Sequence, residues 1–110
     1  MCGFIGYMVQ PNTKHADYAN KIFPHQKRAL SVEKIRLRGT DDSSQWSDHK
    51  VWMGHCRLSI VDLSENGRQP MTHHEYTIVY NGMIYNFKKI RKQLEILGCK
   101  FKTKTDTEVI

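Results

Sequence analysis

The chain has few of the residues that build cross-linked or membrane-embedded proteins. It contains only 3 cysteines, and an odd number without a repeated spacing argues against a disulfide framework. No apolar run approaches the ~20 residues of a transmembrane helix. The apolar start of the chain also lacks the basic residues of a secretory signal. The sequence therefore predicts a soluble protein of the cytoplasm.

Ligands for metals and phosphates are also scarce. His73 and His74 are adjacent, but they fall in a predicted loop, where a preorganised metal site is not expected. The chain has no glycine-rich loop of the kind that cradles phosphates. We therefore expect this chain to bind neither a metal ion nor ATP.

The positive charge of the chain is concentrated near its end. The net charge is +6 over 110 residues. One run supplies much of it: Lys88, Lys89, Arg91, Lys92, Lys100, Lys102 and Lys104. Such a run could contact nucleic acid, but only Phe101 within it could stack on a base. The alternation of lysines from Lys100 to Lys104 is more typical of the solvated side of an edge strand, so we expect no nucleic-acid partner.

Hydrophobic periodicity and turn residues predict one small domain of mixed α and β structure. Strands are predicted at residues 2–9, 51–61, 76–80 and from Phe101 onward. Helices are predicted at residues 16–23, 25–37 and 87–97. Residues 40–49 and 62–69 are predicted as polar loops, and Asn81-Gly82 is typical of a hairpin turn.

Two capping patterns mark the last third of the chain. Asn86 precedes one predicted helix and Gly98 follows it. The apolar face of this helix consists of Phe87, Ile90, Leu94 and Leu97. Thr105 and Glu108 have the spacing of a capping box, yet no helix follows them. We therefore expect the chain to be a fragment of a longer domain.

Cys2 directly follows Met1 and precedes Gly3, so removal of the initiator methionine would leave a terminal cysteine. The reference pKa values of a thiol, about 8.5, and an α-amine, about 7.7–8.0, are close enough for the amine to accept the thiol proton. This is the arrangement of an N-terminal nucleophile. Taken alone, Cys2 is more typical of a small buried cysteine at the start of a strand.

Six short motifs occur along the chain, in the order Met1-Cys2-Gly3, Arg38-Gly39-Thr40-Asp41, Gly54 to Leu63 (GHCRLSIVDL), Gln69-Pro70-Met71, Tyr80 to Asn86 (YNGMIYN) and Thr105 to Ile110 (TDTEVI). Together they resemble the glutaminase domain of asparagine synthetases, which are class II glutamine amidotransferases with an N-terminal nucleophile. The resemblance implies an α+β fold, a four-layer αββα sandwich, of which residues 1–110 would form only the first half. The ATP-using synthetase domain of the family would be absent.

The resemblance also implies a catalytic role for three residues. Cys2 would attack the side-chain amide of glutamine and form a thioester, while its own α-amine passes a proton to the departing ammonia. The side chain of Asn81 and the backbone N–H of Gly82 would stabilise the oxyanion. A tight turn at these two residues would be compatible with that role.

Further residues match the family's substrate pocket. Arg57 would bind the α-carboxylate of glutamine, and Asp106 would bind the α-ammonium. The segment that would line the pocket is Leu58, Ser59, Ile60 and Val61. Taken alone, Arg57 could be an exposed strand residue and Asp106 a helix cap. The two opposite charges complement a free amino acid.

Three positions depart from the family pattern. Met83 stands where the family has a second acid beside the substrate ammonium, Thr40 stands where it has proline, and Cys56 occupies a variable position. Loss of a charge-assisted contact at Met83 would weaken glutamine binding by roughly 1.5–3 kcal/mol. The nucleophile and the oxyanion donors are retained.

The resemblance therefore predicts a glutaminase that supplies ammonia for amide synthesis, with glutamine as substrate and a synthetase domain or subunit as partner. We expect no cofactor in this chain, because ATP and magnesium would belong to the absent synthetase domain. The alternative is an inactive remnant or a non-catalytic binding module, which would contact a partner subunit or use residues 88–104 on nucleic acid. The ammonia acceptor stays open.

Overall fold

A computed structural model describes residues 1–9, 21 and 23–110. The strands are β1 (Gly3–Met8), β2 (Asp42–Ser47), β3 (Val51–Arg57), β4 (Met71–His73) and β5 (Tyr76–Ile78). The helices are α2 (His25–Lys34) and α3 (Phe87–Ile96), with 3-10 turns η1 (Arg36–Arg38), η2 (Glu65–Gly67) and η3 (Thr107–Val109). The mixed α and β class with antiparallel sheets is confirmed. The helix predicted at 16–23 lies almost entirely outside the described residues.

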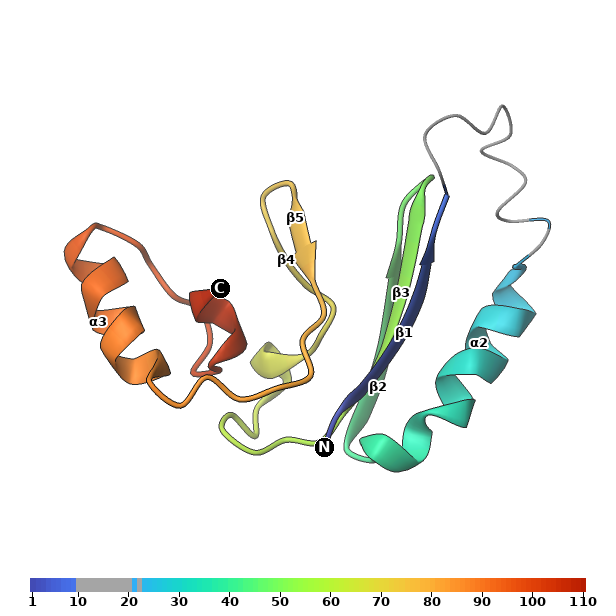
Figure 1. The fold of residues 1–110 in the computed structure, drawn as a ribbon, viewed down its shortest axis with the longest axis horizontal. Helices are drawn as coiled ribbons and strands as arrows, with labels where there is room; N and C mark the ends of the chain where they lie inside the picture. The colour runs from blue at the N-terminus through green and yellow to red at the C-terminus, as the bar shows by residue number, and fades with distance from the viewer. Residues whose placement is uncertain (10–20, 22) are drawn as a thin grey trace.

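The main sheet has three antiparallel strands in the order β1-β3-β2, with β3 at its centre. Helix α2 covers one face of this sheet (Figure 1). Alternate residues of β3 point toward the helix, so that Trp52 and Cys56 are fully buried and form the core with Val32. Tyr7 and Phe23 extend the core, because their rings lie 6.0 and 5.6 Å from that of Trp52. The strand and helix predicted in these regions are confirmed.

The prediction of a loop at residues 40–49 is wrong, because Asp42–Ser47 forms β2. This strand pairs in register with β3, and every second residue is exposed at the edge of the sheet. Polar side chains are tolerated on such a strand because only its pairing side needs a partner. The turn into β3 is held by Asp48, whose Oδ1 accepts hydrogen bonds from the N–H groups of Lys50 (2.7 Å) and Val51 (2.6 Å).

Helix α3 begins and ends near the predicted residues. Asn86 is its N-cap residue, although its side chain makes no capping hydrogen bond. Gly98 has φ of +92°, a left-handed conformation that favours glycine after a helix. The predicted apolar face is only half-buried at Phe87, and Leu97 is 79% exposed.

Two predictions for the last residues are wrong for one shared reason. No strand begins at Phe101, because the N–H groups of Lys102 and Thr103 donate to the carboxylate of Glu108, each at 2.7 Å. These N–H groups are therefore not available to a neighbouring strand. The same contacts occupy Glu108, so the predicted capping box with Thr105 does not form; instead the N–H of Thr105 donates to the hydroxyl of Thr103 (3.1 Å).

Smaller differences concern the strand boundaries around the predicted site. The strand predicted at 51–61 ends at Arg57, and the strand predicted at 76–80 ends at Ile78. His73 ends strand β4, which pairs with β5 in a hairpin, so the predicted loop is wrong for His73, whereas His74 lies in the turn between the two strands. The hairpin was missed because three-residue strands carry little periodic signal.

The molecule is extended, with dimensions of 45 × 32 × 18 Å and a radius of gyration of 15.6 Å. A compact domain of this length would have a radius of gyration of about 13 Å. The main sheet with α2 occupies one side of Figure 1, while the β4–β5 hairpin, α3 and the C-terminal turn occupy the other. In the described part of the chain, no helix is long and apolar enough to cross a membrane.

Candidate active site

Most of the predicted site residues line one small cavity of about 60 Å³. They come from the start of β1, the end of β3 and the loop after it, the segment between β5 and α3, and the turn before η3. The predicted residues at the cavity are Cys2, Arg57, Leu58, Ile60, Val61, Gly82, Met83 and Asp106. Ser59 and Asn81 were also predicted, but they do not line it.

The thiol of Cys2 lies against the end of β3. Its Sγ accepts a hydrogen bond from the N–H of Leu58 (3.3 Å) and lies 3.6 Å from the carbonyl oxygen of the same residue. The guanidinium of Arg38 donates to the carbonyl of Cys2 (3.2 Å) and fixes the main chain there. Cys2 is half-buried, whereas Cys56 is fully buried and burial raises the pKa of its thiol. Cys2 is therefore the better placed nucleophile of the two.

Arg57 is buried at the end of β3, so the alternative of an exposed strand arginine is wrong. Its Nη1 donates to the carbonyl of Ser64 (2.7 Å), and its Nη2 donates to the carbonyl of Asp62. The loop after β3 can approach the guanidinium of Arg57 because residue 67 is glycine. A Cβ at this position would lie 2.2 Å from Nη2 of Arg57. The guanidinium is thus held at the cavity by the loop that follows its own strand.

Asp106 is also buried and connects two of the segments that form the cavity. Its Oδ2 accepts a hydrogen bond from the N–H of Ile84 (2.9 Å). Asp106 occupies the N-cap position of η3, but its side chain makes no capping hydrogen bond to that turn. The carboxylate instead draws the chain after Gly82 toward the cavity.

The Asn81-Gly82 pair lies in an irregular segment between β5 and α3, so the predicted hairpin turn is not present. Gly82 lines the cavity, and a Cβ there would lie 2.4 Å from the hydroxyl oxygen of Tyr80. Asn81 is exposed. Of the two predicted oxyanion donors, only Gly82 is at the cavity.

Sequence reasoning missed several polar residues that line the same cavity: Asp62, Gln69, Tyr80, Thr105 and Thr107. Asp62 accepts hydrogen bonds from the hydroxyl of Ser64 (2.6 Å) and from the N–H groups of Ser64 (2.9 Å) and Lys104 (2.8 Å). These bonds, led by the Ser64 hydroxyl, lower the pKa of Asp62 to about 2. Each of these residues lies within or beside a motif already noted, but no single-residue signal distinguished them.

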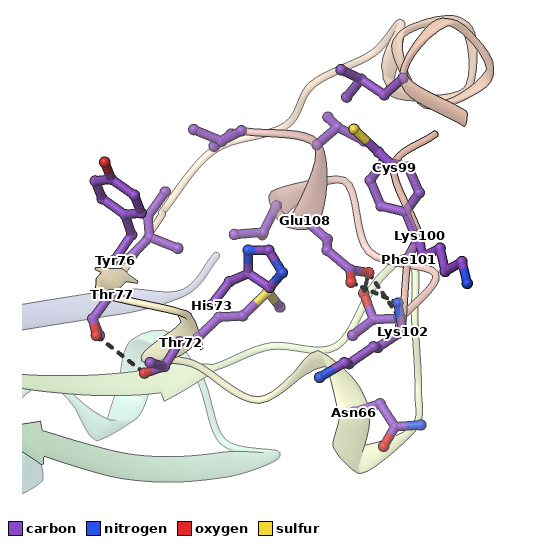
Figure 2. Close-up of a pocket in the computed structure, with 17 residues that line it drawn as sticks. Asn66, Thr72, His73, Tyr76, Thr77, Cys99, Lys100, Phe101, Lys102 and Glu108 are labelled. Atoms are coloured by element: carbon purple, nitrogen blue, oxygen red, sulfur yellow. Dashed lines mark hydrogen bonds between the residues drawn. The ribbon is translucent and has the colours of Figure 1, made fainter. Parts of the chain in front are cut away.

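A much larger cavity, of about 780 Å³, lies between the β4–β5 hairpin and residues 99–110 (Figure 2). Its lining includes the apolar side chains of Tyr76, Phe101 and Val109. Glu108 points into it but is occupied by hydrogen bonds to Lys102 and Thr103. None of the predicted site residues lines this cavity. No group of three or more His, Cys, Asp or Glu side chains suited to a metal ion occurs among the described residues.

Comparison with known proteins identifies the family to which this chain belongs. The whole of residues 1–110 matches the glutamine amidotransferase domain, and the chain belongs to that family. It is 37% identical over 116 residues to glutamine-hydrolyzing asparagine synthetase 3 of Bacillus subtilis (strain 168). It is 39% identical over 113 residues to asparagine synthetase 1 of the same organism. The amidase chry2 of Gibberella zeae is 32% identical over 116 residues.

These three matches cover all of the present chain and 17% of the length of each relative. The chain therefore corresponds to a limited part of each of those proteins.

Proposed function

We propose that this chain is the glutaminase part of an asparagine synthetase-like enzyme, in which Cys2 releases ammonia from the side-chain amide of glutamine. The observation that carries the proposal is the meeting of Cys2, Arg57, Gly82 and Asp106 at one cavity, although they are far apart in the sequence. A nucleophile, an amino-acid-binding pair of opposite charges and a backbone N–H donor are the parts that amide hydrolysis requires. The family membership of the whole chain supports the same reaction.

The proposed reaction begins once Met1 has been removed and the α-amine of Cys2 is free. The amine takes the thiol proton, and the sulfur attacks the amide carbon of glutamine. The C–N bond then breaks, ammonia leaves with the proton returned by the amine, and a thioester remains. Water hydrolyses the thioester to glutamate and restores the thiol. The N–H of Gly82 would stabilise the oxyanion, and the exposed Asn81 would have to turn inward to assist it.

Substrate recognition would use the two buried charges. Arg57 would bind the α-carboxylate of glutamine with N–H groups beyond the two that hold the loop, and Asp106 would bind the α-ammonium. Leu58, Ser59, Ile60 and Val61 would form the wall of the pocket. The cavity of about 60 Å³ is small beside a glutamine molecule, so glutamine binding would require a neighbouring segment to move outward.

The wider organisation follows from the same proposal. The described elements would form part of the four-layer αββα sandwich of the family, and the ammonia would pass to a synthetase domain or subunit that binds ATP and magnesium. The printed names of two relatives favour asparagine synthesis, while the third is an amidase, so the acceptor is proposed as an aspartate-like acid. We propose that this chain itself uses no cofactor and acts in the cytoplasm.

Ammonia release from L-glutamine by the chain that begins at Cys2 tests the proposed function. The variant Cys2→Ser should lower the rate to background, because the serine hydroxyl is a far weaker nucleophile. Cys99→Ser is the matched control, since Cys99 is exposed and lies at the larger cavity, and it should leave the rate unchanged. Ammonia release that survives Cys2→Ser would reject the mechanism. No release by the unsubstituted chain would favour the non-catalytic alternative.

A further inference from the structure

Gln69 belongs to neither the proposed catalytic residues nor the proposed substrate-binding residues, yet it lies among them. It comes just before β4, is buried and lines the small cavity. A buried amide side chain must find partners for both its oxygen and its nitrogen, because an unpaired polar atom in the interior is costly. The hydrogen-bond partners of Gln69 belong to two different segments of the proposed site.

Both polar atoms of the Gln69 side-chain amide form hydrogen bonds. Its Oε1 accepts a hydrogen bond from the N–H of Tyr80 (2.6 Å), and its Nε2 donates to the hydroxyl of Thr107 (3.2 Å). The orientation of the amide is fixed, because only the oxygen can accept from Tyr80. The main chain of Gln69 makes a separate contact, because its carbonyl accepts a hydrogen bond from the hydroxyl of Ser44 in β2.

The hydrogen bond to the N–H of Tyr80 fixes the main chain immediately before the Asn81-Gly82 pair. A second hydrogen bond follows the pair, where the N–H of Ile84 donates to Asp106 (2.9 Å). Thr107, the partner of Gln69, is the neighbour of Asp106. The segment that carries the proposed oxyanion donors is therefore fastened at both ends to the turn that carries the proposed ammonium ligand.

We propose that Gln69 is a positioning residue for the glutamine amidotransferase reaction, holding the N–H of Gly82 in place relative to Cys2. This inference rests on the proposed function. Oxyanion donors act only when they are held within about 2.7–3.1 Å of the developing charge. Loosening the anchor at Tyr80 should therefore impair the chemical step more than the binding of glutamine, which depends on Arg57 and Asp106.

The first part of the test compares three variants in glutamine hydrolysis. Gln69→Leu removes both side-chain hydrogen bonds and should lower kcat by about ten- to a hundredfold, with KM changed less than threefold. Ser44→Ala is the matched control, because it removes a bond to the main chain of Gln69 and leaves the side-chain bonds intact. It should leave kcat within about twofold. Gln69→Glu keeps an acceptor for Tyr80 but loses the donor to Thr107, so its kcat should lie between those of Gln69→Leu and the unsubstituted chain.

The second part separates positioning from folding. Alkylation of Cys2 by iodoacetamide needs no oxyanion donor and should be unchanged in Gln69→Leu, while the backbone N–H of Tyr80 should exchange with deuterium faster. Unchanged kcat in Gln69→Leu, an equal loss in Ser44→Ala, or altered alkylation of Cys2 would overturn the positioning role. Absence of ammonia release from the unsubstituted chain would overturn the proposed function, and the role given to Gln69 with it.

Discussion

At the scale of single residues, the charged side chains at the small cavity also form hydrogen bonds that hold neighbouring segments of the main chain in place. Arg57 holds the loop that follows β3, and Asp106 holds the segment that precedes α3. Because each of them binds main-chain groups, replacing either should disturb the position of a whole segment. Substitutions at these two residues will therefore combine effects on folding and on substrate binding. Substitutions at Met83 and Ser64 allow cleaner tests.

Met83→Glu should tighten glutamine binding, because a carboxylate beside the substrate ammonium would add a charge-assisted contact. The expected gain is roughly 1.5–3 kcal/mol, or a tenfold to hundredfold lower Kd. Met83→Gln is the matched control of similar size without charge and should give a much smaller gain. Isothermal titration with glutamine, using the Cys2→Ser background to prevent turnover, would measure both. Equal affinities for the glutamate and methionine proteins would contradict the role given to this position.

Asp62 should make folding stability depend on acidity. Its pKa of about 2 lies below the unfolded value of about 3.9. Its contribution to stability is therefore complete above about pH 5 and is lost as pH falls through 4 toward 2. Ser64→Ala removes the hydroxyl that contributes most to this shift, so the pKa of Asp62 should rise toward its usual value. Titration of the Asp62 carboxyl by NMR would measure the change, and a pKa already near 3.9 in the unsubstituted chain would contradict it.

At the scale of elements, strands and helices that carry their own periodic pattern could be predicted from the sequence. Strand β1 and helix α3 are such elements, and both lie close to their predicted residues. Strand β2 could not be predicted, because its polar residues form a strand only through pairing with β3. Residues 100–104 show the reverse case, since their strand-like alternation is overridden by hydrogen bonds to Glu108 and Asp62.

The site divides in the same way. Cys2, Arg57 and Asp106 could be proposed from the sequence, because the motifs that contain them resemble those of a known family. Gln69 could not be chosen, because its importance comes from joining Tyr80 to Thr107, which are 11 and 38 residues away in the sequence.

The packing of α2 on the main sheet depends on the small size of Gly54. A Cβ at this position would lie 2.5 Å from Cγ2 of Val32, so Gly54→Ala should push the helix away from β3. Overpacking of this kind costs about 1–3 kcal/mol of unfolding free energy. Leu30→Ala, at an exposed position of the same helix, is the control and should change stability by less than about 0.5 kcal/mol.

The double variant Gly54→Ala with Val32→Ala isolates the contact, because it removes the obstructing methyl groups. Urea unfolding of the single and double variants should show a favourable coupling between the two positions. Simple additivity would contradict direct packing of Val32 on Gly54.

At the scale of the whole molecule, the extended shape leaves apolar surface uncovered around the larger cavity. Tyr76 at its edge is 73% exposed, Ile110 is 67% exposed, and Ile96 on α3 is 85% exposed. Exposed apolar surface of this kind promotes association or binding of apolar dyes. The described elements thus place the small cavity beside a face that has little cover of its own.

The chain should therefore bind a hydrophobic dye under native conditions. Replacing Tyr76 and Ile110 with lysine should reduce the dye fluorescence, because it places charges at the edge of the larger cavity. Leu63→Lys is the matched control, since Leu63 is 80% exposed but does not line that cavity. Dye fluorescence that is equal in all three proteins would contradict an apolar face at this location.

Intact-mass analysis after incubation with a glutamine-mimicking diazoketone tests whether Cys2 is the nucleophile of a glutamine-binding site. We expect a single adduct on the chain that begins at Cys2, mapped to Cys2 and suppressed by free glutamine. Cys56 should stay unlabelled because it is fully buried, and the exposed Cys99 should react no faster than a free thiol. Absence of an adduct, or labelling of Cys2 and Cys99 alike without protection by glutamine, would contradict the assignment of Cys2 as the nucleophile of a glutamine-binding site.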